Sequence, residues 1–412
     1  MPALLEVGSG VHATFRALRH KSFRRFFIGQ AISIQGNWLQ QVALSWLVYR
    51  TTGSALLLGV VAFANQAPIF FIAPFSGLLA DRLDRRRLLI WTQSFAALQA
   101  MLLAILASGG WIAAWHIVTL ALLYGVILGL DTPVRHALFV DLVDDRADLP
   151  NAIALNSFLM NCGRLIGPSI AGIALIFVSE GVCFLINAFS YLGMIWVAWT
   201  LAPAPPKNQT QIKGLLASLG EGLQYARQTP SIRLLLAMVA CIGFFGSSYL
   251  VLMPIFAKDV FFGGAETLGF LVGFAGLGAV FGTIHLATRR DLQRLAGQLG
   301  YTAILAGIAL LLVGLSRSLW TTYPLMICLG FGIIVTASSV NILLQSMVED
   351  DKRGRIVSFY AMAFMGVMPF GSLAAGSLAD VVGARATAVA FGIICAALGL
   401  LLGRRLRRSI PA

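Results

Sequence analysis

Hydrophobic residues in this chain form twelve long runs that are separated by short polar segments. A helix needs about 20 apolar residues to cross the hydrocarbon core of a bilayer, and each run approaches or exceeds that length. The pattern therefore predicts an all-α membrane protein with twelve transmembrane helices. The expected spans are residues 24–50, 55–80, 88–108, 115–140, 152–178, 181–202, 231–257, 266–287, 298–316, 319–347, 356–379 and 385–403.

The longest polar break, residues 203–230, divides the spans into six and six. It opens with three prolines in four positions, which end the sixth span. Ile212, Leu215, Leu219 and Leu223 then recur at helical spacing, which indicates an amphipathic helix on the cytoplasmic membrane surface. The expected domains are a basic N-terminus at 1–22, a six-helix bundle at 23–202, the linker at 203–230, a second six-helix bundle at 231–403 and a basic tail at 404–412.

The two halves carry matching local features. An acidic-basic turn, 144–146 in the first half and 350–352 in the second, precedes a helix with an Ala-Gly pair, at 171–172 and 375–376. These matches, together with the central linker, indicate an internal duplication that produces two pseudo-symmetric six-helix bundles. Duplicated halves of this kind place a binding site near the membrane midplane, at the interface between them.

The composition supports a bilayer environment, since 58% of residues are hydrophobic, 11% are charged and the mean hydropathy is +0.84. A soluble domain carries roughly a quarter charged residues. The net charge of +13 could suggest a nucleic-acid partner, but the basic residues follow the topology instead. Nearly all lie on segments that share the side of the N-terminus, which predicts cytoplasmic termini and excludes a nucleic-acid partner. The opposite side holds only Arg50, Lys258, Arg317 and Arg385.

The chain shows none of the patterns that enzymes or metalloproteins need. Its five cysteines fall in apolar segments without metal-ligand spacing, so we expect them to pack in helix contacts. No nucleophile elbow, phosphate loop or metal cluster is present. We therefore expect no enzymatic activity, no cofactor and no metal, and we also find no removable signal peptide.

The most specific motif follows the second span, at residues 77–89, and reads Gly-Leu-Leu-Ala-Asp-Arg-Leu-Asp-Arg-Arg-Arg-Leu-Leu. It resembles the signature loop of the major facilitator superfamily, with Asp84 in place of the usual Gly. Asp tolerates the left-handed turn conformation, so we expect the turn to survive. The resemblance implies a cytoplasmic latch in which Asp81 pairs with Arg135 or with the start of span eleven at Gly354. The residues assigned to this gate are Gly77, Asp81, Arg82, Arg85, Arg86 and Arg135.

A second motif lies in span five, where Gly163, Gly167, Pro168 and Gly172 are spaced as in the exporter branches of the superfamily, with Ala171 replacing one glycine. Small residues permit close helix packing, and proline removes a backbone hydrogen bond. We expect span eight to be the partner, through glycines at 273, 276, 278 and 282.

Further stretches at 15–25, 33–38, 131–135, 151–157 and 354–356 resemble the bacterial branch that includes enterobactin exporters and macrolide efflux pumps. The similarity extends over nearly the whole chain. It implies a monomeric secondary transporter of the bacterial inner membrane that exports small amphiphilic molecules by alternating access, with H+ as the coupling ion and lipids around it. Members of this branch often carry Asp at the position of Asn37. Because this chain has Asn there, the resemblance implies no proton-binding carboxylate in span one.

Polar groups inside the spans are candidates for function. In span one, Gln30, Asn37 and Gln41 share a narrow stripe, and such amides either line a wet cavity or join helices. We favour the cavity, because superfamily members line theirs with spans one, four, seven and ten. Arg164 in span five either binds an anionic substrate or pairs with Asp131. Asp131 in turn is the proton-coupling candidate, or it pairs with Arg135 or Arg164.

Phe244, Phe245 and Tyr249, with Met365 and Met368 on span eleven, offer a soft apolar wall for varied amphiphiles, although packing or lipid contact explains each residue at least as well. Two other functions fit the same pattern. A lysolipid exporter or flippase of the same fold predicts a cavity open sideways to lipid beside the linker helix. A membrane receptor without transport predicts no cavity between the bundles.

Overall fold

The computed structural model describes residues 16–143, 145–201, 228–288 and 291–409, and within the second long helix it describes side chains only up to residue 72. All regular elements in these ranges are helices. The first half contains η1 (Arg16–Arg19), α2 (Lys21–Thr52), α3 (Ala55–Arg82), α4 (Arg85–Ser108), α5 (Ala114–Asp141), η2 (Arg146–Asp148), α6 (Leu149–Phe177) and α7 (Glu180–Thr200).

The second half begins with a span that alternates between two helix types. It consists of α9 (Pro230–Cys241), a π-helical turn (Ile242–Gly246), α10 (Tyr249–Ile255) and a second π-helical turn (Phe256–Val260). The remaining helices are α11 (Ala265–Ala287), α12 (Leu292–Leu315), α13 (Leu319–Met347), α14 (Asp350–Phe364), α15 (Met368–Val382) and α16 (Ala384–Ser409).

Eleven helical segments of the described chain are long and apolar enough to cross a membrane. They correspond to the second to twelfth expected spans, with α9 and α10 forming one span and α14 and α15 another. The first expected span is α2, which is 32 residues long but carries buried amides that lower its hydropathy. The expected helix positions are therefore confirmed, and α2 is the polar member of the set.

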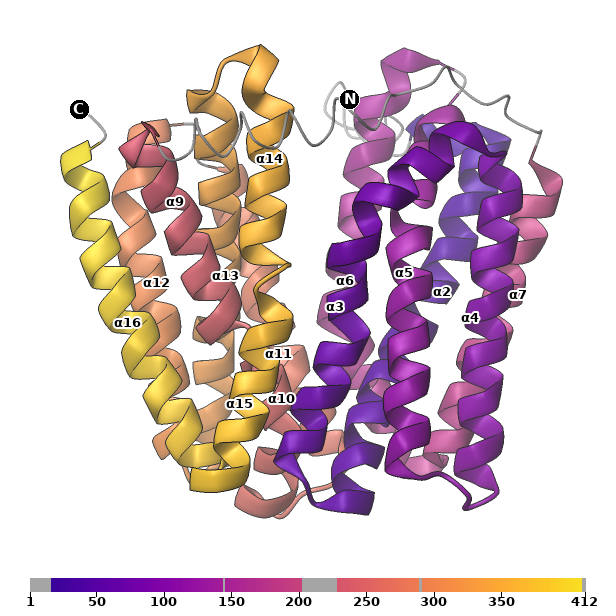
Figure 1. Ribbon diagram of the computed structural model, residues 1–412, viewed down its shortest axis with the longest axis horizontal. Coiled ribbons are helices and arrows are strands. Elements are labelled where there is room, and N and C mark those ends of the chain that lie inside the picture. Colours follow the sequence, from indigo (N-terminus) through magenta and orange to yellow (C-terminus); the bar gives the residue numbers. More distant parts are fainter. Residues whose placement is uncertain (1–15, 144, 202–227, 289–290, 410–412) are drawn as a thin grey trace, which may run out of the picture.

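The helices form two bundles that lie side by side (Figure 1), with α2–α7 in one and α9–α16 in the other. The described chain begins and ends at the same end of the molecule, which we call the termini end, and we call the other the far end. The main contacts between bundles are α6 with α11 and α3 with α15. In contrast, α14 packs on α9 and α13 of its own bundle. The bundles therefore approach each other toward the far end.

Small residues make this approach possible. A side-chain carbon added at Gly59 of α3 would lie 3.1 Å from the Cα atom of Gly376 on α15. A carbon added at Gly172 of α6 would lie 2.8 Å from the Cα atom of Gly269 on α11. Helices meet closely in lipid when glycine removes the side chain at the contact, so these two pairs bring the bundles together.

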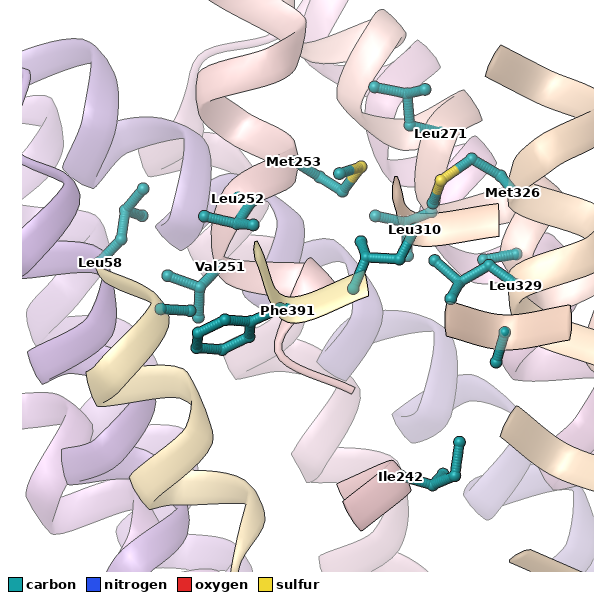
Figure 2. Packing of buried hydrophobic residues seen from close by; sticks show 14 of the residues in the cluster. Leu58, Ile242, Val251, Leu252, Met253, Leu271, Leu310, Met326, Leu329 and Phe391 are labelled. Carbon is teal, nitrogen blue, oxygen red and sulfur yellow. The ribbon is translucent and has the colours of Figure 1, made fainter. Parts of the chain in front are cut away.

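A large apolar cluster continues across this contact. Figure 2 shows part of it, where Leu58 of α3 belongs to the same cluster as Val251 and Leu252 of α10 and Phe391 of α16. Leu252 is fully buried. The cluster ties the second bundle to the far half of the first.

The expected linker helix at 211–228 falls almost wholly in residues 202–227, outside the described residues.

The signature loop differs from expectation at Asp84. This residue has φ −61° and ψ 111°, which is extended rather than left-handed, and its side chain accepts a 2.9 Å hydrogen bond from the Arg86 N–H. Asp84 therefore begins α4 as a helix cap, a role that aspartate fills better than glycine.

Candidate functional site

A cavity of about 370 Å³ lies between the two bundles. It is lined from the first bundle by α2, α3, α5 and α6, and from the second by α10, α11, α15 and the turn before α10. A cavity at this interface contradicts the receptor alternative. Its polar lining residues are Asn37, Gln40, Gln41, Ser45, Asn65, Gln66, Tyr124, Arg164, Ser247 and Ser372.

Of the amide side chains on α2, some line the cavity and one joins two helices. Asn37 and Gln41 line the cavity. Gln30 does not, since it is 4% exposed and its Nε2 donates a 2.9 Å hydrogen bond to Asn156 Oδ1 of α6. The expected cavity position is therefore wrong for Gln30, because α6 covers that part of the stripe and satisfies the amide.

Asn37 belongs to a hydrogen-bond network inside the first bundle. Its Oδ1 accepts from the hydroxyls of Tyr124, at 3.0 Å, and Tyr191, at 2.5 Å. Asn187 donates to the Tyr191 hydroxyl at 3.3 Å and to Gln40 Oε1 at 2.8 Å. The network spans α2, α5 and α7, and it satisfies polar groups whose burial would otherwise be costly.

Arg164 reaches the cavity from the middle of α6. Among the residues whose side chains are described, no carboxylate lies within ion-pair distance of its guanidinium, and Asp131 pairs elsewhere. The pairing of Arg164 with Asp131 is therefore wrong. The geometry leaves an arginine that faces a cavity near the middle of the bundle, where an anion can bind.

Asp131 is 3% exposed and forms an ion pair with Arg135, one helical turn further along α5, at 2.5 Å. Its other oxygen accepts 2.7 Å hydrogen bonds from Thr92 Oγ1 and Gln93 Nε2 of α4. Residues four apart share a helix face, which explains why Arg135 is the partner. Arg135 is thus engaged within its own bundle in this conformation.

Of the expected apolar wall, Met368 lines the cavity, whereas Phe244, Phe245, Tyr249 and Met365 lie outside its lining. Phe244 packs against Phe245, with ring centroids 4.7 Å apart, and toward Phe391, so it faces the interior of its own bundle. Met365 is 60% exposed at the end of α14. Tyr249 lies within electrostatic reach of Arg164 without lining the cavity. The π-helical turn shifts the helical register of this span, which the residue spacing did not predict.

The described part of the signature loop contacts the first bundle. Arg86 donates to the Trp199 carbonyl oxygen at the end of α7, at 2.8 Å, and Arg85 is 8% exposed. The side chains of Gly77, Asp81 and Arg82 lie outside the described residues. Arg86 therefore ties α4 to α7 on one side of the molecule.

The span-five glycines face two different partners. Side-chain carbons added at Gly163 and Gly167 would meet Ile34 and Trp38 of α2, at 2.4 and 2.5 Å. Gly172 faces α11 instead, where Gly269 also approaches the carbonyl of Pro168. The expected α11 partner is confirmed for the glycines at 273 and 276, while those at 278 and 282 face α13. A stripe of glycines on one helix can thus serve two neighbours.

Several cavity residues carried a sequence signal that was not used. Asn65 and Gln66 are amides inside an expected span, and Trp38 stands next to Asn37 in a motif. Polar side chains in a span are candidates by the same argument that selected Gln41. Tyr124 had no such signal, since a lone tyrosine in an apolar helix is common.

Comparisons with known proteins place the chain among transporters. A family model described as a transmembrane secretion effector matches residues 12–411. The chain is 27% identical to the staphyloferrin A transporter of Staphylococcus aureus, over 89% of this chain and 92% of the relative. It is 26% identical to the multidrug efflux pump Tap of Mycolicibacterium fortuitum, over 89% and 91%. It is 23% identical to macrolide efflux protein A of Streptococcus pyogenes, over 91% and 94%.

Solved structures share the fold at lower identity. A bacterial homologue of the human lysosomal transporter Spinster, in an inward-facing and unoccupied conformation, aligns with a TM-score of 0.69 at 14% identity, over 95% of this chain and 99% of the other. The nucleoside transporter NupG aligns with a TM-score of 0.72 at 13% identity, over 95% and 100%.

Proposed function

Because this chain belongs to the transmembrane secretion effector family of major facilitator transporters, we propose that it exports small amphiphilic molecules of the siderophore or drug type by alternating access. The membrane would be the bacterial cytoplasmic membrane, with both termini inside the cell and the monomer as the transporting unit. The names of three relatives, a siderophore transporter and two efflux pumps, support this substrate range.

The observation that carries the proposal is the cavity between the bundles. Side chains from both bundles line it, so a relative movement of the bundles changes its access. The glycine contacts hold α3 to α15 and α6 to α11 toward the far end, whereas α14 packs within its own bundle. This arrangement supports a state that is open toward the termini end, and the basic residues at that end support our proposal that it faces the cytoplasm.

Export would be driven by protons that move inward, with Asp131 as the coupling site. Asp131 is the buried carboxylate among the described membrane-spanning side chains, and its ion pair with Arg135 gives protonation a structural consequence. A proton on Asp131 would release Arg135, and Arg135 could then contact other groups at the termini end. Gly77, Asp81 and Arg82, with Arg85 and Arg86, would form the gate at that end.

Inverted membrane vesicles test the proposal directly. Vesicles with the protein should accumulate a siderophore or a drug-like dye when their interior is acidic, and nigericin, which collapses the pH gradient, should stop accumulation. Vesicles without the protein are the control. Failure to accumulate any member of a panel of siderophores, macrolides and anionic and cationic dyes would contradict the proposal. Accumulation of lysophosphatidylcholine alone would replace it with the lipid exporter.

A further inference from the structure

The hydrogen bonds around Asn37 determine which way its side-chain amide faces in the cavity. Its side chain has one acceptor oxygen and one donor nitrogen, and the two differ in what they offer to a ligand. The oxygen accepts from Tyr124 and Tyr191, and the nitrogen has no hydrogen-bond partner among the described residues. Since Asn37 lines the cavity, its nitrogen is the polar atom left for a ligand.

The orientation can be traced to a backbone group. The carbonyl of Leu120 on α5 can only accept, and Gln99 Nε2 of α4 donates to it at 3.2 Å. Gln99 must therefore turn its oxygen toward Gln40, and Gln40 Nε2 donates to that oxygen at 3.2 Å. The oxygen of Gln40 then faces Asn187, whose Nδ2 donates to it at 2.8 Å.

The same chain of donors continues to the cavity. Asn187 Nδ2 also donates to the Tyr191 hydroxyl oxygen at 3.3 Å, so the Tyr191 proton must point elsewhere. Its nearer acceptor is Asn37 Oδ1 at 2.5 Å, compared with 3.2 Å for the Tyr124 hydroxyl. If the Asn37 amide were flipped, its nitrogen would face the two tyrosine hydroxyls. One of the two hydroxyl protons, of Tyr124 or Tyr191, would then lack an acceptor within the network. Gln99, Asn187 and Tyr191 are each at most 2% exposed and do not line the cavity, so water does not compete for their bonds, whereas Gln40 is 3% exposed and touches the cavity.

We propose that this relay makes Asn37 a fixed hydrogen-bond donor in the cavity, and that the site selects ligands with an anionic oxygen, which Asn37 and Arg164 bind together. The inference rests on the proposed function only in that it takes this cavity as the substrate site. Tyr191 does not line the cavity and is a positioning residue, because it acts through the orientation of Asn37.

The probes are fluorescein and rhodamine 123, which share a ring skeleton and carry opposite charges. Binding to the purified full-length protein is measured by fluorescence polarisation. We expect the wild type to bind fluorescein more tightly. N37D keeps the acceptor for the tyrosines but replaces the donor with a second oxygen, so it should weaken fluorescein binding by about tenfold and leave rhodamine 123 binding unchanged or tighter.

A second variant tests the relay at a distance. Y191F should weaken fluorescein binding by about threefold without changing rhodamine 123 binding, because Asn37 loses one of the two hydroxyls that hold its oxygen. Y323F, a tyrosine of the other bundle that lines no part of the cavity, is the matched control and should change neither affinity. The selectivity between the two dyes is the readout, since loss of folded protein would lower binding of both.

Equal loss of both dyes in folded N37D and Y191F would overturn the inference, as would unchanged fluorescein binding in N37D. A wild type that binds rhodamine 123 but not fluorescein would overturn the inference and leave the proposed export function standing. A wild type that binds neither dye and transports nothing in vesicles would overturn both.

Discussion

Asp131 and Arg135 lie one turn apart on α5 and form an ion pair of 2.5 Å in which the Asp131 side chain is 4% exposed. Thr92 and Gln93 of α4 complete the coordination of the carboxylate. Breaking a buried pair by removing one partner costs about 3–5 kcal/mol, because the other charge remains unpaired. The pair therefore has a structural role that any test of proton coupling must separate from the coupling itself.

The double variant D131N/R135Q makes that separation. It removes both charges and leaves a polar side chain at each position, so neither charge stays buried without its partner, and we expect thermal stability much closer to wild type than that of D131N alone. If Asp131 couples transport to protons, export by the double variant in vesicles should no longer respond to a pH gradient while substrate still binds. A double variant that transports with an unchanged pH-gradient response would show that Asp131 has only the structural role.

Arg164 should matter most for anionic substrates. R164A removes the guanidinium that faces the cavity, and a charge-assisted hydrogen bond is worth about 1.5–3 kcal/mol, so uptake of an anionic dye should fall by at least tenfold. Uptake of a neutral macrolide should change little. R317A, at an exposed loop arginine, is the control and should leave both rates unchanged. Equal loss for both substrates, together with less folded protein, would support a packing role instead.

Gly172 tests the contact that joins the bundles toward the far end. In G172V the new side chain would meet Gly269 and the Ala265 carbonyl at under 3 Å, and overpacking costs roughly 1–3 kcal/mol. We therefore expect the state with this contact to lose population by about fivefold or more. A cysteine at Met160, which lines the cavity, should react less with an impermeant maleimide added at the termini end.

The matched control for G172V is G193V, since a side chain added at Gly193 of α7 meets nothing within 4 Å. Both variants are compared in a background without the native cysteines. The contact would have no influence on cavity access if G172V and G193V gave the same labelling rates from both sides.

The start of the described chain docks on the turn before α6 through Asp148. Arg19 Nη2 and His20 Nε2 lie 2.7 and 2.9 Å from this buried carboxylate, Arg16 also pairs with it, and the Ala17 N–H donates to Asn151. The hydrogen bond from His20, followed by that from Arg16, holds the pKa of Asp148 below its ordinary value of 3.8.

A lowered pKa in the folded state means that this contribution is complete above about pH 4 and is lost as the pH falls through the lowered value. At neutral pH, D148N should mimic that loss and raise amide hydrogen exchange at residues 16–20. D145N is the control, because Asp145 lies 3.6 Å from Arg19 at a half-exposed site and should have a small effect. Equal exchange in D148N and wild type would contradict the docking role.

The variant D81N tests the proposed gate at the termini end. D81N should favour the state open at the termini end, slow turnover and leave substrate affinity intact. An ion pair partly screened by water is worth about 1 kcal/mol, which shifts a two-state equilibrium roughly fivefold. In this structure Arg135 is paired with Asp131. We therefore expect the effects of D81N and R135Q on cysteine accessibility to be additive in the double variant. A non-additive double variant would show that the two residues pair in another state.

The sequence alone determined the helices and their order. Span length and apolar content are local properties, and the bilayer imposes the same requirement on each segment, so eleven of the expected spans reappear as candidate membrane helices. The small-residue contacts were also visible, since glycine spacing on α6 marks a face where another helix can approach. Asn37, Gln41 and Arg164 were found because polar groups inside an apolar span need a partner or a wet site.

The tertiary structure decided which partner each group has. Gln30 and Asn37 share one stripe of α2, yet Gln30 bonds to α6 and Asn37 reaches the cavity, because different neighbours cover the two ends of the stripe. Phe244 packs with Phe245 and Phe391 inside its own bundle, in a π-helical turn that the residue spacing did not predict. The donor character of Asn37 depends on a backbone carbonyl of α5, which acts through four side chains, those of Gln99, Gln40, Asn187 and Tyr191. Such relationships exist only after the helices have packed, because each hydrogen bond depends on which helix lies beside which.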